Sequence, residues 1–117
     1  MILNESFYNF EREAIMMNIA NISCTQIKKI LSEQYKNAIV TKRTFDKVGF
    51  YTYFEIPNHI ERLKSDIKPF GNVEFNINDT EASVGCVIFV KNGAISVLEC
   101  YTNTGSLPEE IKTFSSK

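Results

Sequence analysis

The sequence VGCVIFVKNGAISVL, residues 84–98, decides the fold, because two β-favouring apolar runs flank the pair Asn92-Gly93. Both residues of this pair tolerate the positive φ that a type I′ turn requires, so Asn-Gly between such runs is a strong local signal for a β-hairpin. The first run has almost no polar member, which predicts a central strand covered on both faces. The stretch therefore indicates structure and carries no catalytic motif.

The same turn predicts the register of the hairpin. With a two-residue loop, Cys86 lies opposite Glu99. Because successive residues of a strand face opposite sides of the sheet, Cys86 and Cys100 would point to different faces and could not form a disulfide. Together with Cys24 they are an odd set without C-x-x-C spacing, so we expect three buried free thiols and no zinc site.

Upstream of this hairpin, apolar residues recur at helical spacing in two segments. Residues 4–18 predict an amphipathic helix, with Glu11 among the polar residues between the apolar positions. Ser23 and Gln26 fit a capping box, which predicts a second helix from there to about residue 35. The apolar stripes consist of Phe7, Phe10, Ala14 and Met17 in the first helix and of Ile27, Ile30, Leu31 and Tyr35 in the second.

From Ala38 onward the pattern has a period of two, which is typical of strands. Residues 39–45 and 50–56 are rich in β-branched and aromatic side chains, and residues 46–49 supply a turn between them. Residues 73–77 predict a further half-buried strand, and residues 108–110 predict the first turn of a final helix. In residues 50–56, the expected core face consists of Phe50, Thr52, Phe54 and Ile56, and the other face of Tyr51, Tyr53 and Glu55.

These patterns together predict an α+β fold in which two N-terminal helices pack on an antiparallel sheet of about five strands. The chain of 117 residues suffices for a single domain, residues 1–117, with one core. No apolar run approaches the roughly 20 residues that cross a bilayer. Residues 1–6 lack the basic region and the cleavage site of a secretory signal. We therefore expect a cytoplasmic protein without a membrane partner.

No group of residues predicts catalysis, a cofactor or a metal site. His59 is the only histidine and has no partner at ligand spacing, so we expect it in a surface loop. No serine lies in a G-x-S-x-G motif, and no glycine-rich loop has the spacing that binds phosphate. Glu109 and Glu110 are adjacent and diverge in direction, which disfavours a general acid–base pair. The sequence thus predicts a protein that is not an enzyme.

Basic and aromatic residues in the first hairpin raise the alternative of nucleic-acid binding. The segment KVGFYTYF, residues 47–54, resembles the RNP1 pattern of RNA-recognition domains, in which aromatic side chains stack on bases. Those domains alternate helices with strands, whereas here two helices come first, and the net charge of the chain is −1. We therefore favour ordinary packing of this hairpin and expect no nucleic-acid partner.

Charge is distributed unevenly along the chain. Six basic residues and two acidic residues lie between residues 25 and 47, whereas six acidic residues and one basic residue lie between residues 69 and 110. An acidic surface of this kind steers a basic partner, and the open alternative is a solvated face without a partner. The residues that we expect to bind a partner are Glu74, Asp79, Glu81, Glu99, Tyr101, Glu109 and Glu110.

Three segments carry a family resemblance. They are GFYTYFEIP at residues 49–57, the pattern G-x-x-x-F-V-K-N-G-x-x-S-x-L-E-x-Y at residues 85–101, and PEEI at residues 108–111. In this order they resemble small bacterial immunity proteins of polymorphic-toxin and contact-dependent growth-inhibition systems. The resemblance covers residues 49–111 and implies a protein that binds and neutralises one cognate toxin. Cys100 and Asn103-Thr104 depart from the glycine or aromatic residues expected there.

The resulting hypothesis is a cytoplasmic immunity protein that needs no cofactor. It would cover a cationic toxin, such as a nuclease, with its acidic residues. The alternative from another class is a small-ligand-binding or regulatory domain, for which a cavity between helices and sheet would be evidence. The sequence leaves the oligomeric state open. The aromatic pocket of that alternative would consist of Phe50, Tyr53, Phe75 and Phe89.

Overall fold

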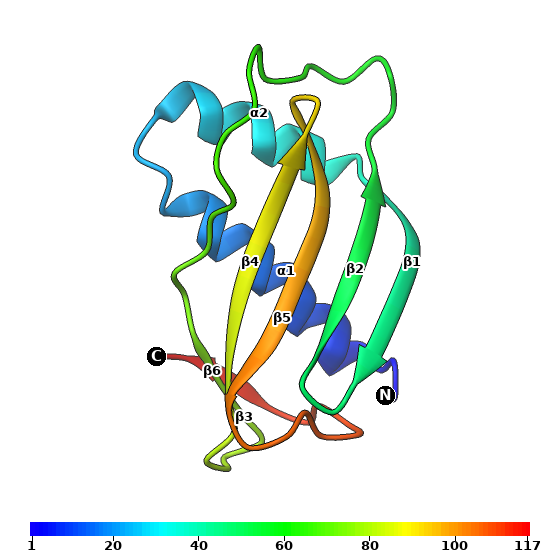
Figure 1. Ribbon diagram of the computed structural model, residues 1–117, viewed down its shortest axis with the longest axis vertical. Helices are drawn as coiled ribbons and strands as arrows, with labels where there is room; N and C mark the ends of the chain where they lie inside the picture. The colour runs from blue at the N-terminus through cyan, green and yellow to red at the C-terminus, as the bar shows by residue number, and fades with distance from the viewer.

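The computed structural model describes residues 1–117 and contains two helices followed by one sheet (Figure 1). The sheet has six strands in the spatial order β1-β2-β5-β4-β3-β6, and every pair of neighbours is antiparallel. The predicted α+β fold is confirmed, with six strands rather than about five. The elements are α1 (Glu5–Ala20), α2 (Thr25–Lys36), β1 (Ile39–Asp46), β2 (Gly49–Glu55), β3 (Phe75–Ile77), β4 (Ser83–Lys91), β5 (Ala94–Thr104) and β6 (Phe114–Ser116).

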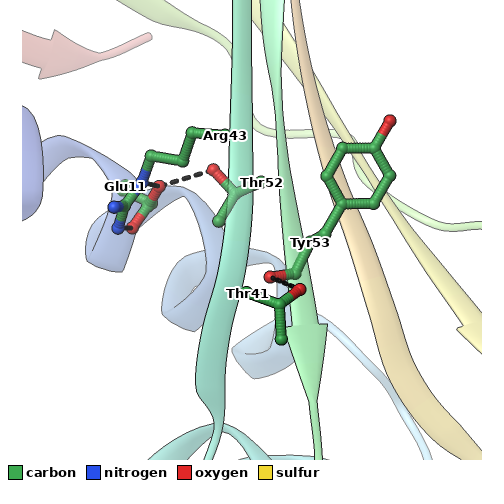
Figure 2. A network of polar contacts seen from close by, with 5 residues as sticks. All are labelled: Glu11, Thr41, Arg43, Thr52 and Tyr53. Atoms are coloured by element: carbon green, nitrogen blue, oxygen red, sulfur yellow. Dashed lines mark hydrogen bonds and ion pairs between the residues drawn. The ribbon is translucent and has the colours of Figure 1, made fainter.

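Both helices lie on the same side of the sheet (Figure 1). On β2, Phe50 and Thr52 face the helices and are 1% and 0% exposed, which confirms the predicted core face of this strand. Figure 2 shows Thr52 directed toward α1 and Tyr53 directed away from it. The prediction that residues 84–90 are covered on both faces is wrong. Strand β4 lies inside the sheet, but Val87 and Phe89 are only half-buried on the side that no helix covers.

Phenylalanine rings fill the layer between α1 and the sheet. Phe7 of α1 packs on Phe50 of β2 with ring centroids 5.2 Å apart. Phe10 packs edge-to-face on Phe75 of β3 at 5.2 Å and on Phe114 of β6 at 5.4 Å. Such tilted and edge-to-face pairs add to the burial of apolar surface, which is the main favourable term in folding. This contact of α1 with both halves of the sheet produces a single core.

A β-bulge corrects the predicted register of the β4–β5 hairpin. Asn92 and Gly93 form the expected turn with φ of 53° and 75°, and Lys91 pairs with Ala94. The pairing then shifts by one residue, because Val90 pairs with Ile95 whereas Phe89 pairs with Val97. A bulge places two residues of one strand against one residue of its partner. Beyond it, each residue of β5 therefore lies opposite a different residue of β4, and faces the other side of the sheet, compared with the predicted register.

As a result, two cysteines that were predicted on opposite faces lie on the same face. Cys86 pairs with Cys100, and their Sγ atoms are 3.4 Å apart in the core. Both thiols are buried and free, whereas Cys24 is free but exposed, so the prediction of three buried thiols is wrong for Cys24. Burial is the main cause that raises the pKa of Cys100 well above 9.0.

A buried ion pair joins α1 to the first hairpin (Figure 2). Glu11 is 5% exposed, and its two carboxylate oxygens accept hydrogen bonds of 2.9 and 2.8 Å from Nε and Nη2 of Arg43 on β1. The hydroxyl of Thr52 on β2 donates a third hydrogen bond of 2.6 Å to the same carboxylate. The hydrogen bond to Glu11 is the main cause that raises the pKa of Arg43. One carboxylate therefore holds a helix and two strands together.

Two buried amide side chains join the helices to the loops. Gln34 of α2 donates to the carbonyl of Gly93 at 2.8 Å and accepts from the amide of Ile95 at 2.9 Å. Asn18 of α1 accepts from the amides of Asn72 and Val73 at 2.9 and 3.1 Å. Each amide satisfies backbone groups that would otherwise be buried without a partner. The helix layer is thereby fixed relative to the β4–β5 turn and to the segment that precedes β3.

Two predicted helix features are absent. Helix α2 starts after Cys24, whose side chain makes no capping hydrogen bond, so the capping box of Ser23 and Gln26 does not form. Residues 108–110 form no helical turn; this segment bends at Glu109 and lies against the N-terminus, where the backbone amide of Ile2 donates to the carbonyl of Glu109 at 2.7 Å. The chain then enters β6, which pairs with β3. The polar pairing with the N-terminus outweighs the local helix preference here.

Strand β1 is one edge of the sheet. A second bulge lies between Val40 and Lys42, and the hydroxyl of the intervening Thr41 donates to the carbonyl of Tyr53 at 3.3 Å (Figure 2). Bulges twist an edge strand and interrupt its regular row of backbone groups.

We predict that Glu11→Gln lowers the free energy of unfolding by about 2–3 kcal/mol, because it leaves the partly buried guanidinium of Arg43 without its counter-charge. Urea unfolding followed by circular dichroism measures the effect. The matched control is Glu13→Gln on the same helix, whose carboxylate makes no hydrogen bond or ion pair in the structure, and it should change the stability by less than about 0.5 kcal/mol. Equal effects of both substitutions would contradict the role of the ion pair.

We also predict that an aromatic disulfide reagent at pH 8 modifies one thiol of the native protein within seconds and the other two only upon unfolding. The exposed Cys24 supplies the fast reaction, whereas Cys86 and Cys100 are buried and the thiolate is the reactive form. The variant Cys24→Ser should abolish the fast phase. A fast phase of two or three thiols would show that the β4–β5 core opens readily.

Candidate protein-binding surface

The face of the sheet opposite the helices is uncovered along β2, β5 and β4 (Figure 1). Residues directly opposite each other on antiparallel strands share a face, so the register identifies its members. Tyr51 pairs with Glu99, which in turn pairs with Val87. In the same way Tyr53 pairs with Val97, and Val97 with Phe89. We call this surface the open face, and it consists of Tyr51, Tyr53, Val87, Phe89, Val97, Glu99 and Tyr101.

The tyrosines of the open face are held in place by their neighbours. The rings of Tyr51 and Tyr53 are stacked with centroids 6.3 Å apart, and the hydroxyl of Tyr51 donates to Oε2 of Glu99 at 2.9 Å. The ammonium of Lys42 on β1 lies 5.6 Å from the centroid of the Tyr53 ring, within the range of a cation–π contact. The hydrogen bond to Glu99, followed by the negative charge of that carboxylate, raises the pKa of Tyr51 above 10.0.

Tyr101 lies across the neighbouring strand. It is directly opposite Gly85, and a Cβ placed on Gly85 would be 2.6 Å from Cζ of the Tyr101 ring. The absent side chain of Gly85 therefore leaves the space that the ring occupies. Tyr101 covers β4 in this way and is still 37% exposed, close to the 38% of Tyr51. The open face thus displays the carboxylate of Glu99 with one exposed tyrosine, Tyr51, on one side of it and a second, Tyr101, on the other.

The acidic residues that the sequence predicted for partner binding occupy two regions. Glu99 lies on the open face with Tyr101. Glu74, Asp79 and Glu81 lie instead around β3 and the turn that follows it, at the lower end of the sheet in Figure 1. The side-chain amide of Asn103 at the end of β5 donates to the carboxylate of Glu74 at 3.1 Å, and the hydroxyl of Thr104 donates to the backbone carbonyl of Glu81 at 2.7 Å. Glu74 also lies 3.8 Å from the exposed ammonium of Lys117.

The remaining two predicted acids lie against the N-terminus. Glu109 pairs with the N-terminal ammonium at 3.3 Å, although its side chain is 92% exposed. The carboxylate of Glu110 accepts a hydrogen bond from the side-chain amide of Asn4 at 3.1 Å. Its backbone carbonyl accepts one from the side-chain amide of Asn78 at 2.7 Å. The contact with Asn78 places Glu110 beside the turn that holds Asp79. Five of the predicted acids therefore gather at one end of the molecule, and Glu99 is separate from them.

The aromatic pocket of the alternative hypothesis does not form. Phe50 and Phe75 are buried in the core, whereas Tyr53 and Phe89 belong to the open face, so the sheet itself separates the two pairs. A hollow of about 380 Å³ lies elsewhere, between α2 and residues 61–67. Its apolar side chains are Ile27, Ile30, Leu63 and Ile67.

His59 is exposed in the loop after β2, as the sequence predicts. No three side chains of histidine, cysteine, aspartate or glutamate lie close enough together to hold a metal ion. Neither helix has the length and apolar character that a membrane crossing requires.

Sequence reasoning identified part of the open face. Glu99 and Tyr101 are two residues apart in one strand, so their common face follows from the alternation of the strand. The alternation of β2 predicts the correct face for Tyr51, but its contact with Glu99 depends on how β2 pairs with β5. Because β2 and β5 are separated by about forty residues of chain, no local signal contains this pairing.

Comparisons of the chain with protein-family models, with curated proteins and with solved structures gave no match.

We predict that Glu99→Gln lowers the pKa of Tyr51 toward 10.0. The carboxylate stabilises the protonated phenol as a hydrogen-bond acceptor and repels the phenolate, so its neutralisation favours loss of the proton at a lower pH. A titration of tyrosine Cζ signals by ¹³C NMR measures the shift, with Tyr51→Phe to assign the resonance. Glu74→Gln, at the distant end of the sheet, serves as the control and should leave the pKa of Tyr51 unchanged.

Proposed function

We propose that this protein is an immunity protein, which binds and neutralises one cognate toxin domain in the cytoplasm. The observation that carries the proposal is the open face, where Tyr51 and Tyr101 are exposed beside half-buried aliphatic and aromatic side chains. Contiguous apolar and aromatic patches on a protein surface are typical of protein interaction sites. Tyrosine is enriched in the energetically dominant part of interfaces, because it buries a large area and loses little conformational freedom.

Charge supports a basic toxin as the partner. Glu99 lies among the tyrosines, and five further carboxylates lie toward the end of the sheet formed by β3, the β3–β4 turn and the N-terminal contact. A central aromatic anchor with an acidic margin attracts a cationic protein from a distance and gives the bound complex its specificity. Such a protein would act by covering the toxin, and its own chain would need no reactive group.

The test uses the toxin domain encoded by the gene next to that of this protein. Co-expression of the intact protein should protect cells from this domain, and binding can be followed by biolayer interferometry. We predict that Tyr101→Ala weakens the complex about 30-fold and that Glu99→Lys slows association about ten-fold at low salt. The effect of Glu99→Lys should shrink as the salt concentration rises, because salt screens the interaction between exposed charges.

The matched control is Glu61→Lys, which makes the same charge change in the exposed loop beside α2, away from the open face. It should leave protection and affinity within about two-fold of the original protein. Full protection by Tyr101→Ala and Glu99→Lys, with both variants correctly folded, would refute the open face as the binding surface. Absence of any toxin among the neighbouring genes would refute the immunity assignment itself.

A further inference from the structure

Tyr51, Glu99 and Tyr101 are neighbours at the centre of the open face. Glu99 lies between Tyr51 on β2 and Val87 on β4, and Tyr101 is on the same side of β5 two residues further on. The Tyr101 ring covers Gly85, so its inner side rests on the sheet and its outer side faces solvent. A flat group that lies on the outer side of the Tyr101 ring is therefore next to the carboxylate of Glu99, which is two residues earlier on the same side of the strand.

The two oxygens of Glu99 differ in their surroundings. Oε2 accepts the hydrogen bond from Tyr51, which fixes the direction of the carboxylate. Oε1 accepts no hydrogen bond from any other residue of the protein, and the side chain is only partly buried. One oriented oxygen is thus free to accept hydrogen bonds from a group outside the chain.

The open face already holds a cation of its own. Lys42 reaches over the edge of the sheet and places its ammonium above the Tyr53 ring. This contact shows that a positive group can reach the Tyr53 ring on the open face. No such cation of the chain lies on the Tyr101 ring.

We infer that Tyr51, Glu99 and Tyr101 bind the guanidinium of an arginine from the partner protein. The inference rests on the proposed function, and it specifies the chemistry of the residue that the partner inserts. A guanidinium is planar, stacks on aromatic rings and donates hydrogen bonds in its own plane, so it satisfies a tyrosine face and Oε1 of Glu99 together. The ammonium of a lysine offers a point charge without a face that stacks. Val87 and Val97 provide apolar surface beside Glu99 for the methylene groups of the arginine.

The experiment is a titration of the ¹⁵N-labelled, full-length protein with Nα-acetyl-arginine amide, observed by heteronuclear NMR. We expect shifts concentrated at the amides of Tyr51, Glu99 and Tyr101. Nα-acetyl-citrulline amide has nearly the same shape without the charge and should produce shifts about three-fold smaller at the same concentration. Nα-acetyl-lysine amide should fall between the two.

Substitutions complete the test. Glu99→Gln keeps the shape of the side chain and should reduce the response to the arginine compound to that of the citrulline compound. Glu74→Gln, an exposed carboxylate outside the open face, should retain the full response. Adenosine monophosphate is included as an anion that can stack on the tyrosines. Because the carboxylate of Glu99 repels its phosphate, adenosine monophosphate should cause smaller shifts than the arginine compound.

The inference is overturned by equal shifts from the arginine and citrulline compounds, by shifts centred on Glu74, Asp79 and Glu81, or by a stronger response to adenosine monophosphate. Loss of toxin binding in Tyr101→Ala without an arginine response would leave the proposed function standing and reject the arginine. An arginine response in a protein that neutralises no toxin would support the arginine site and reject the proposed function.

Discussion

The buried ion pair between Glu11 and Arg43 keeps its hydrogen bonds only when the side of the first hairpin that carries Thr52 faces the helices. Removing two charges from water is costly, and the cost is met only where the geometry is close and the remaining polar groups are satisfied. Here the carboxylate accepts two hydrogen bonds from Arg43 and one from Thr52. A slip of β1 or β2 by one residue would move these partners to the other face and bury Tyr51 and Tyr53 instead. The open face is the side of the hairpin opposite this pair.

Local patterns were sufficient for the elements and insufficient for their exact pairing. The helices, both hairpins and the inward face of β2 follow from apolar spacing and from the turns at residues 46–49 and 92–93. The bulge after Phe89 does not follow from these patterns, because no feature of the sequence marks Ser96 as the residue of β5 that has no partner on β4. For that reason the prediction that Cys86 and Cys100 face opposite sides of the sheet is wrong. Glu11 was placed with the polar residues of its helix. Its spacing of four from Phe7 and three from Ala14 puts it on the apolar stripe, which is the signal that its burial required.

The candidate site shows the same division between local and distant information. The alternation of β5 places Glu99 beside Tyr101, but the hydrogen bond from Tyr51 arises from the pairing of the distant strands β2 and β5, and the position of Tyr101 opposite Gly85 depends on the bulge in the β4–β5 hairpin. All of these residues belong to strands, and the helix layer behind the strands is joined to them by buried polar contacts from Glu11, Asn18 and Gln34. A surface built on strands loses little conformational freedom when a partner binds.

The edge strand β1 adds a constraint on how this protein meets other proteins. A long regular edge next to an aromatic sheet face invites copies of a chain to join strand to strand and grow into fibres. The bulge at Thr41 interrupts the row of backbone hydrogen-bonding groups on which such growth depends, and the two residues that follow it, Lys42 and Arg43, are positively charged. The exposed tyrosines of the open face thus lie next to an edge that is poorly suited to strand-to-strand growth.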